Sequence, residues 1–183
     1  MVGLTEYKLN TNDFIGGWYI NTDLCNRIVS KYENSTKEFV YDEPREYSWW
    51  DFGDFDNELC EEYCGNLINT LSHYTEKYPM AHEHLEPWGF TRPRLQCYKP
   101  NNAYHVSHCE NDGHPDHIKR HLAFMTYLTT IENGGGTEFV QQGVTTPSHA
   151  GLTLIWPAGW THYHKGIVAP KDSKYIVTGW CCF

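Results

Sequence analysis

Apolar residues in the first half of the chain recur with the period of a helix. In TDLCNRIVSKYEN, Leu24, Ile28 and Tyr32 follow one another every four residues, so they share one helix face. Thr22 or Asp23 is suited to cap the start of this helix. The pattern predicts an amphipathic helix that begins near these two residues.

A second helix is predicted from Asn57 to about Tyr78. Acidic residues occupy its first turn and Lys77 its last, as the helix dipole favours. One apolar stripe runs along it: Cys60, Cys64, Leu67, Ile68, Leu71 and Tyr74. The segment between the helices, YDEPREYSWWDFGDF (residues 41–55), is aromatic, acidic and rich in turn formers, and we expect a surface loop able to close over a ligand.

From Arg92 onward the pattern changes to short runs rich in β-branched and aromatic residues, separated by Gly, Pro and Asn. Six of these runs are candidate strands: RLQCYK, YHVSHC, HLAFMTYLTT, TEFVQQ, GLTLIWP and KYIVTGW. Helices followed by antiparallel strands predict an α+β fold in one domain. We expect residues 1–91 to be mostly helical support and loop, and residues 92–183 to form a small β barrel or sandwich that carries the site.

Composition narrows the classes of function. At 183 residues the chain fits one domain, and 15% aromatic content excludes a disordered polymer. A net charge of −9 without a basic run disfavours nucleic acid and anionic membranes as partners. No apolar run approaches the roughly 18 residues of a membrane helix. Seven cysteines without a secretory signal are typical of reduced thiols, so we expect a cytoplasmic protein.

The stretch YHVSHCEND contains candidate metal ligands. On a strand, residues two apart face the same side, so His108 and Glu110 would project together and Cys109 away from them. His105, three residues before His108, would lie on the opposite face, and we expect it to be structural. One further histidine from a distant strand would complete the two-histidine, one-carboxylate arrangement of non-haem Fe(II) oxygenases.

Candidates for the distant ligand lie in PAGWTHYHKG, where His162 and His164 share a strand face. Ten residues past His164, in the terminal strand, comes Lys174. A cation at the end of such a pocket would pair with a dicarboxylate that chelates iron by its other end.

Residues 94–180 resemble the catalytic core of the prolyl-4-hydroxylase-like 2-oxoglutarate/Fe(II) dioxygenases. Tyr98 precedes His108 by ten residues, as a tyrosine does in that family. The family's Arg-to-Tyr-Leu strand is matched by RHLAFMTYL, its GG-x-T-x-F turn by GGGTEFV, and its V-x-P-x-x-G strand by VTTPSHAGLTLIWP. The spacing from His164 to Lys174 and on to Trp180 follows the same pattern. The compact length is similar to stand-alone members from bacteria and their viruses.

The resemblance implies a double-stranded β-helix, a jelly roll like that of the cupins, in which His108, Glu110 and His164 bind Fe(II). The spacing to Lys174 favours His164 over His162. The implied reaction consumes O₂, decarboxylates 2-oxoglutarate to succinate and CO₂, and hydroxylates a substrate C–H bond. Ascorbate is a further cofactor that the resemblance brings into consideration.

Roles for the cosubstrate also follow from the resemblance. Lys174 would pair with the C5 carboxylate of 2-oxoglutarate, with Tyr127 or Thr137 as hydroxyl partners. Tyr98 would form a hydrogen bond near the C1 end. Trp180 would pack beside the metal, although a plain core aromatic explains it equally well.

One residue departs from the family pattern. The family usually has His-x-Asp, whereas Glu110 is one methylene longer, and Asp112 is a second candidate for the carboxylate ligand. His114 and Asp116 match His-x-Asp literally. Against this pair, Tyr98 would then lie sixteen residues upstream, and the intervening proline disfavours a paired central strand.

The leading substrate is a prolyl residue in a peptide or protein, because the motif order resembles the prolyl-4-hydroxylase branch. Tyr47, Trp49 and Trp50 of the aromatic loop could clamp an extended chain, and Arg120 is a further candidate contact. These aromatics are also explained as a satellite core under the loop. The alternatives are hydroxylation of a free amino acid or other small molecule, and a low-turnover binding or sensing module on the same fold.

Overall fold

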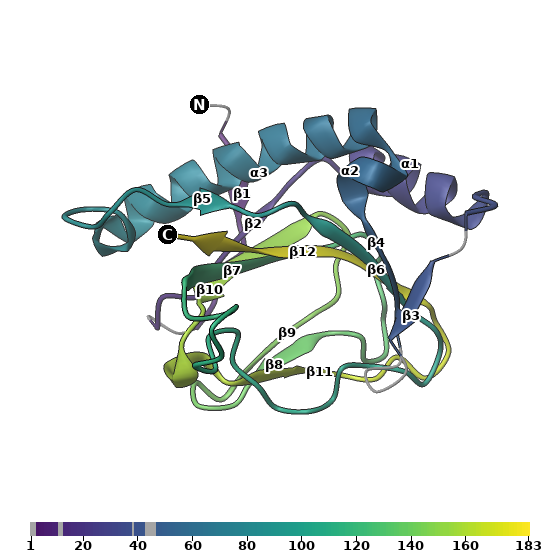
Figure 1. The fold of residues 1–183 in the computed structure, drawn as a ribbon. Helices are drawn as coiled ribbons and strands as arrows, with labels where there is room; N and C mark the ends of the chain where they lie inside the picture. The colour runs from purple at the N-terminus through teal and green to yellow at the C-terminus, as the bar shows by residue number, and fades with distance from the viewer. Residues whose placement is uncertain (1–2, 11–12, 38, 43–46) are drawn as a thin grey trace.

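Two antiparallel sheets and a layer of helices make up the molecule (Figure 1). The computed structural model describes residues 3–10, 13–37, 39–42 and 47–183. In Figure 1 the helices cover the upper face of the larger sheet, and the smaller sheet lies beneath its other face. The expected mixture of helices and antiparallel sheets is confirmed.

The larger sheet has the strand order β1-β2-β10-β7-β12-β6-β4-β3, and β5 pairs with β12. Every pairing in it is antiparallel. Its strands are β1 Thr5–Glu6, β2 Gly16–Tyr19, β3 Val40–Asp42, β4 Tyr47–Asp51, β5 Gly89–Phe90, β6 Arg94–Tyr98, β7 Arg120–Tyr127, β10 Leu152–Pro157 and β12 Lys174–Cys182.

The smaller sheet contains β11 (His164–Gly166), β8 (Thr137–Phe139) and β9 (Val144–Thr146) in that order. An isolated antiparallel bridge joins His108 to His164 beside it. His108, which lies far earlier in the chain, is thereby fixed beside His164, the first residue of β11.

The two central strands, β7 and β12, are buried on both faces, which explains why they appear in the sequence as nearly continuous apolar runs. Alternate side chains serve two separate cores. Phe124 and Val177 pack toward the helices, whereas Met125 and Ile176 pack between the sheets. Lys174 is two residues from Ile176, so its side chain lies on the inter-sheet side of β12.

Helix α1 (Thr22–Glu33) buries Leu24, Ile28 and Tyr32, as its periodicity predicts. The expected cap was wrong by one residue. Asn21 is the N-cap, and its side chain accepts a hydrogen bond from the backbone nitrogen of Asp23.

Helix α3 (Asn57–Lys77) confirms the second predicted helix, and Asp56 caps it through the backbone nitrogen of Leu59. The predicted stripe is wrong at Ile68, which is 55% exposed, because the buried face turns toward Tyr63 and Thr70. The shorter helical segments are α2 (Phe52–Phe55), η2 (Pro79–Ala81) and η3 (Trp160–His162). No helix in the described part of the chain is long and apolar enough to span a bilayer.

Five of the six candidate strands are present, and the sixth is wrong. YHVSHC forms no strand; it runs as irregular chain that contacts β11 through the bridge at His108 and through the Tyr104 carbonyl, which accepts from Gly166 N. The surface loop predicted over residues 41–55 is also wrong where the structure describes it. Its aromatic residues alternate along β4, which pairs with β6, and α2 follows directly; residues 43–46 lie outside the described residues.

Candidate metal centre and its cavity

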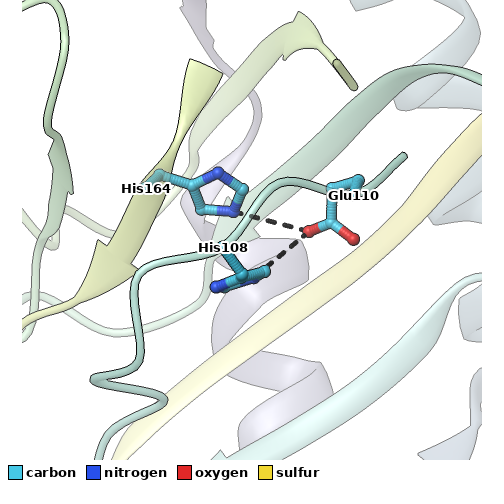
Figure 2. Close-up of side chains that lie close together, drawn as sticks. All are labelled: His108, Glu110 and His164. Carbon is cyan, nitrogen blue, oxygen red and sulfur yellow. Dashed lines mark ion pairs between the residues drawn. The ribbon is translucent and has the colours of Figure 1, made fainter. Parts of the chain in front are cut away.

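The side chains of His108, Glu110 and His164 converge on one point (Figure 2). Glu110 Oε1 lies 3.6 Å from His108 Nε2 and 3.4 Å from His164 Nε2, and one ligand atom from each residue lies within 4.8 Å of the others. Atoms that bind one metal ion at about 2.1 Å and at right angles lie about 3 Å apart. Two nitrogens and one oxygen at this spacing therefore fit a divalent transition metal with only small shifts.

Backbone hydrogen bonds hold the three residues in place although two of them are outside regular structure. His108 N donates to His164 O at 3.0 Å, and His164 N donates to His108 O at 2.9 Å. Glu110 N donates to Ala158 O at 3.0 Å, just past the end of β10. The irregular segment is thus attached to both sheets at the residues that carry the side chains.

Both histidines are oriented for metal binding through Nε2. His108 Nδ1 lies 2.8 Å from Val106 O, and His164 Nδ1 lies 2.9 Å from His162 O. A carbonyl oxygen only accepts, so Nδ1 carries a proton in each ring, and Nε2, directed at Glu110, is the nitrogen left to bind a metal. This is the tautomer that a metal ligand requires.

The second oxygen of Glu110 is held by other partners. Trp180 Nε1 donates to Oε2 at 2.6 Å, and Arg120 Nη1 lies 3.5 Å from Oε2 and donates to the Glu110 carbonyl at 2.9 Å. Burial raises the pKa of this carboxyl, but its contacts with His108 and His164 outweigh burial and hold the pKa well below its usual range. Oε1 is therefore a charged oxygen directed at the imidazoles.

A cavity of about 400 Å³ opens beside the three residues and extends to Lys174. The Lys174 side chain is 3% exposed, and among the described residues it has no ion pair or hydrogen bond. Its Nζ lies 4.7 Å from the Tyr98 ring centroid, and burial lowers its pKa to about 8. Trp156, which also lines the cavity, has a buried Nε1 without an acceptor among the described residues. A buried cation and a buried donor without partners among the described residues fit an anionic ligand in this cavity.

The three predicted hydroxyl groups lie at or behind the cavity wall. Thr137 lines the cavity, and its Oγ1 lies 2.6 Å from the hydroxyl of Tyr127, which stands behind it and also contacts Thr146. Tyr98 lines the cavity beside Lys174, and its hydroxyl donates to Gln96 at 3.1 Å. Only Thr137 and Tyr98 are therefore in position to touch a ligand in this cavity.

The rival histidines lie elsewhere. Both ring nitrogens of His162 have partners, with Nε2 2.7 Å from Asp13 O and Nδ1 2.9 Å from Thr161 Oγ1. Burial lowers the pKa of His162, which suits a neutral ring in a structural role. His105 contacts the carbonyl of Ala103 and does not line the cavity.

The rival carboxylates are likewise separate from the cluster. Asp112 accepts from the backbone of His114 and lies 2.9 Å from Nδ1 of His117. Asp116 is 84% exposed and faces His114 at 3.7 Å. Neither belongs to a group of three metal-ligating side chains in the described part of the chain.

The three candidate aromatics divide between the two faces of β4. Tyr47 and Trp49 line the cavity. Trp50 packs against Phe39 and the helix-side core, so its expected substrate contact is wrong. Alternation along a strand is the reason, since neighbours project to opposite sides. Arg120 lines the cavity and stacks on Trp180 at 3.8 Å.

Sequence reasoning missed several cavity residues, including Arg94, Gln96 and Tyr104. Arg94 and Gln96 precede Tyr98 by four and two residues on the same strand, so period-two alternation would have found them. The Tyr104 ring lies 4.1 Å from the His108 ring. It precedes an irregular segment, and no pattern in the sequence indicates that contact.

No protein-family model and no curated protein matches the sequence. Solved structures of prolyl hydroxylases do match the fold. The viral collagen prolyl hydroxylase of Paramecium bursaria Chlorella virus-1, in complex with 2-oxoglutarate, superposes with a TM-score of 0.69 at 14% identity, over 93% of this chain and 96% of its own. The Pseudomonas putida prolyl-4-hydroxylase gives 0.68 at 17% identity, over 93% of each chain.

A prolyl hydroxylase from Trichoplax adhaerens, bound to a peptide fragment of the hypoxia inducible factor oxygen degradation domain, gives a TM-score of 0.68 at 16% identity. That match covers 93% of this chain and 84% of the other. The chain therefore has a prolyl-4-hydroxylase-like fold.

Proposed function

We propose that this protein is an Fe(II)- and 2-oxoglutarate-dependent dioxygenase that hydroxylates a prolyl residue in a peptide or protein. One observation carries the proposal. The convergent atoms of His108, Glu110 and His164 share a cavity with Lys174, a buried cation that has no anionic partner among the described residues. A metal site with an ammonium group at the far end of its cavity suits a chelating ketoacid with a distal carboxylate.

Each residue has a defined task in this proposal. His108, Glu110 and His164 hold Fe(II) on one side and leave the other side to ligands. Iron with 2-oxoglutarate and O₂ supplies the oxidising chemistry, yielding succinate, CO₂ and a hydroxylated product. Lys174 binds the C5 carboxylate, and Thr137 donates its hydroxyl beside it. Trp180 and Arg120 fix Oε2 of Glu110, so that a single oxygen faces the metal.

We further infer that the two sheets form a double-stranded β-helix and that residues 1–183 act as one domain. Support comes from the TM-scores of 0.68 and 0.69 over 93% of the chain. The two cores pack against opposite faces of the same central strands, which favours one cooperative unit.

A prolyl peptide is the favoured substrate for two reasons. The similar structures include a viral collagen prolyl hydroxylase and a prolyl hydroxylase bound to a peptide fragment. In this chain, the indoles of Trp49 and Trp180 flank the cavity, and aromatic walls suit proline-rich extended chains.

Two measurements test the proposal in turn. The purified protein is first loaded with Fe(II) and 2-oxoglutarate without oxygen, and a weak visible charge-transfer band is sought. Oxygen is then admitted, and succinate is assayed with pools of proline-containing and proline-free peptides. We expect the band, succinate, and a mass gain of one oxygen atom confined to the proline-containing pool. If both the charge-transfer band and succinate are absent, the dioxygenase proposal is refuted. If oxygen is gained in the proline-free pool alone, the proposed prolyl substrate is refuted.

A further inference from the structure

Arg94 lies between two indole rings at the wall of the cavity. Its guanidinium carbon is 4.7 Å from the ring centroid of Trp49 and 5.3 Å from that of Trp180. Arg94 begins β6 and pairs with Thr178 of β12, so the sheet fixes the position of its backbone. The side chain is half-buried and lines the same cavity as the candidate metal ligands.

The guanidinium of Arg94 forms no ion pair or hydrogen bond with the residues that the structure describes. The other two cations of the cavity are accounted for. Arg120 donates to Glu110, and Lys174 faces the part of the cavity that the proposed function assigns to 2-oxoglutarate. Of the carboxylates that line the cavity, Glu110 contacts both histidines and Asp112 contacts His117. Asp42, the third, stands opposite Tyr47 of β4 and acts on Tyr98, at the other end of β6 from Arg94. One cation at the cavity wall is therefore uncommitted.

An arginine packed against indole rings can still present the N–H donors at the edge of its guanidinium to an acceptor. Contact with two rings also restricts rotation of the side chain, so less freedom remains to be lost when an acceptor binds. A carboxylate matches this fork with two parallel hydrogen bonds. Since the chain carries a net charge of −9, its overall field repels anions, and recognition of an acidic ligand has to be local.

The position of Arg94 relative to the metal ligands indicates whether the substrate or 2-oxoglutarate supplies the carboxylate. The Trp180 indole that stacks on Arg94 also donates to Glu110 Oε2 at 2.6 Å. One indole therefore separates Arg94 from the ligand carboxylate. On β12, Lys174 stands opposite Tyr98, Thr178 stands opposite Arg94, and Trp180 follows two residues later. A group bound to Arg94 would therefore sit toward the Glu110 end of these strands, away from Lys174, where a substrate C–H bond would meet the metal site.

We propose that Arg94 binds a carboxylate of the substrate, next to the C–H bond that is hydroxylated. The carboxylate belongs either to an acidic residue beside the target proline in a peptide or to the α-carboxylate of a free amino acid. This inference rests on the proposed function, because it takes the metal and cosubstrate sites as assigned above.

Binding and turnover are measured with four probes: a prolyl peptide with glutamate beside the proline, the same peptide with glutamine there, free L-proline, and L-prolinamide. Binding to the Mn(II)-loaded protein is followed by indole fluorescence, and turnover with Fe(II) by product mass. We expect the glutamate peptide, or free proline, to bind at least about tenfold more tightly than its uncharged counterpart. The pair that shows the difference identifies the source of the carboxylate.

Variants at Arg94 test the residue itself. Arg94→Gln should remove the discrimination between charged and uncharged probes, and Arg94→Lys should keep part of it, since the charge remains but the fork is lost. Arg92→Gln is the matched control, because Arg92 is an exposed arginine already paired with Asp51 and Asp54. It should retain full discrimination and full succinate formation.

Equal affinities of the wild-type protein for both members of both pairs would overturn the inference. Discrimination that survives in Arg94→Gln would overturn it as well. Failure of the proposed function has a different signature: the wild-type protein forms no succinate with Fe(II), 2-oxoglutarate and oxygen. The binding arm does not depend on turnover, so Arg94-dependent discrimination would still support the carboxylate site in that case.

Discussion

Trp180 Nε1 donates a hydrogen bond of 2.6 Å to Oε2 of Glu110, the oxygen that faces away from the two histidines. The longer glutamate side chain has one more rotatable bond than an aspartate, and this hydrogen bond fixes its terminal carboxylate. Arg120 stacks on the same indole at 3.8 Å and donates to the Glu110 carbonyl. The stacked pair therefore positions the carboxylate so that Oε1 alone faces His108 and His164.

Trp180→Phe should weaken metal binding by about tenfold or more, because loss of a hydrogen bond to a ligand typically costs 10–100-fold in metal affinity. Phenylalanine keeps an aromatic ring under Arg120 but has no donor for Oε2. Anaerobic titration with Fe(II) or Co(II) measures the change. Trp88→Phe is the control, since Trp88 Nε1 donates to the Ala81 carbonyl away from the cavity. Equal metal affinity in both variants would contradict the positioning role.

The two neighbouring histidines should respond oppositely to substitution. His164→Ala removes a nitrogen of the proposed metal site and should abolish tight metal binding and succinate formation without substrate. His162→Ala should leave both largely intact, yet lower the free energy of unfolding by about 1–3 kcal/mol, because a partly buried hydrogen bond to the Asp13 carbonyl is lost. Metal titration and denaturant unfolding of each variant separate the two effects. Loss of metal binding in His162→Ala alone would reverse the ligand assignment.

The cavity walls could be predicted from strand alternation. Tyr98, Lys174 and Trp180 are candidate site residues on β6 and β12, and alternation from them reaches Gln96, Arg94, Ile176 and Thr178, all of which line the cavity. The same rule divides Trp49 from Trp50. The signal is strong here because buried strands enforce a strict period of two.

The segment around His108 could not be predicted in the same way. It looks like a strand because its residues have β propensity, but it forms no ladder. Its position depends on a few backbone hydrogen bonds to His164, Gly166 and Ala158, which are distant in sequence. Such tertiary contacts leave no periodic pattern. The family resemblance singled out His108 and Glu110, whereas the strand argument given for their shared orientation was wrong.

Lys174→Met should stabilise the metal-free protein and abolish 2-oxoglutarate binding. Burial lowers the Lys174 pKa from 10.5 to about 8, so the fold disfavours the charged form, and stability should rise as pH increases from about 8 to 10.5. At about 1.4 kcal/mol per pKa unit, an apolar side chain should add up to about 3 kcal/mol at neutral pH. Denaturant unfolding measures this, and calorimetry measures 2-oxoglutarate binding to the Mn(II)-loaded protein.

The exposed Lys171 offers the control for that experiment, because Lys171→Met changes neither a buried charge nor the cavity. It should alter stability and cosubstrate binding little. If Lys174→Met destabilised the protein while 2-oxoglutarate still bound, Lys174 would be a structural residue and not the cosubstrate anchor.

The affinity for 2-oxoglutarate should fall as pH rises through about 8. Below that pH Lys174 is protonated in the ligand-free protein and can pair with the C5 carboxylate; above it, binding must first take up a proton. The dissociation constant of the Mn(II)-loaded protein, measured on both sides of pH 8, should therefore increase by up to about tenfold per pH unit on the alkaline side. Pyruvate has the same ketoacid end without a distal carboxylate, so its weaker binding should lack this step. An identical pH dependence for the two ketoacids would assign the titration to the metal end of the cavity and contradict the role of Lys174.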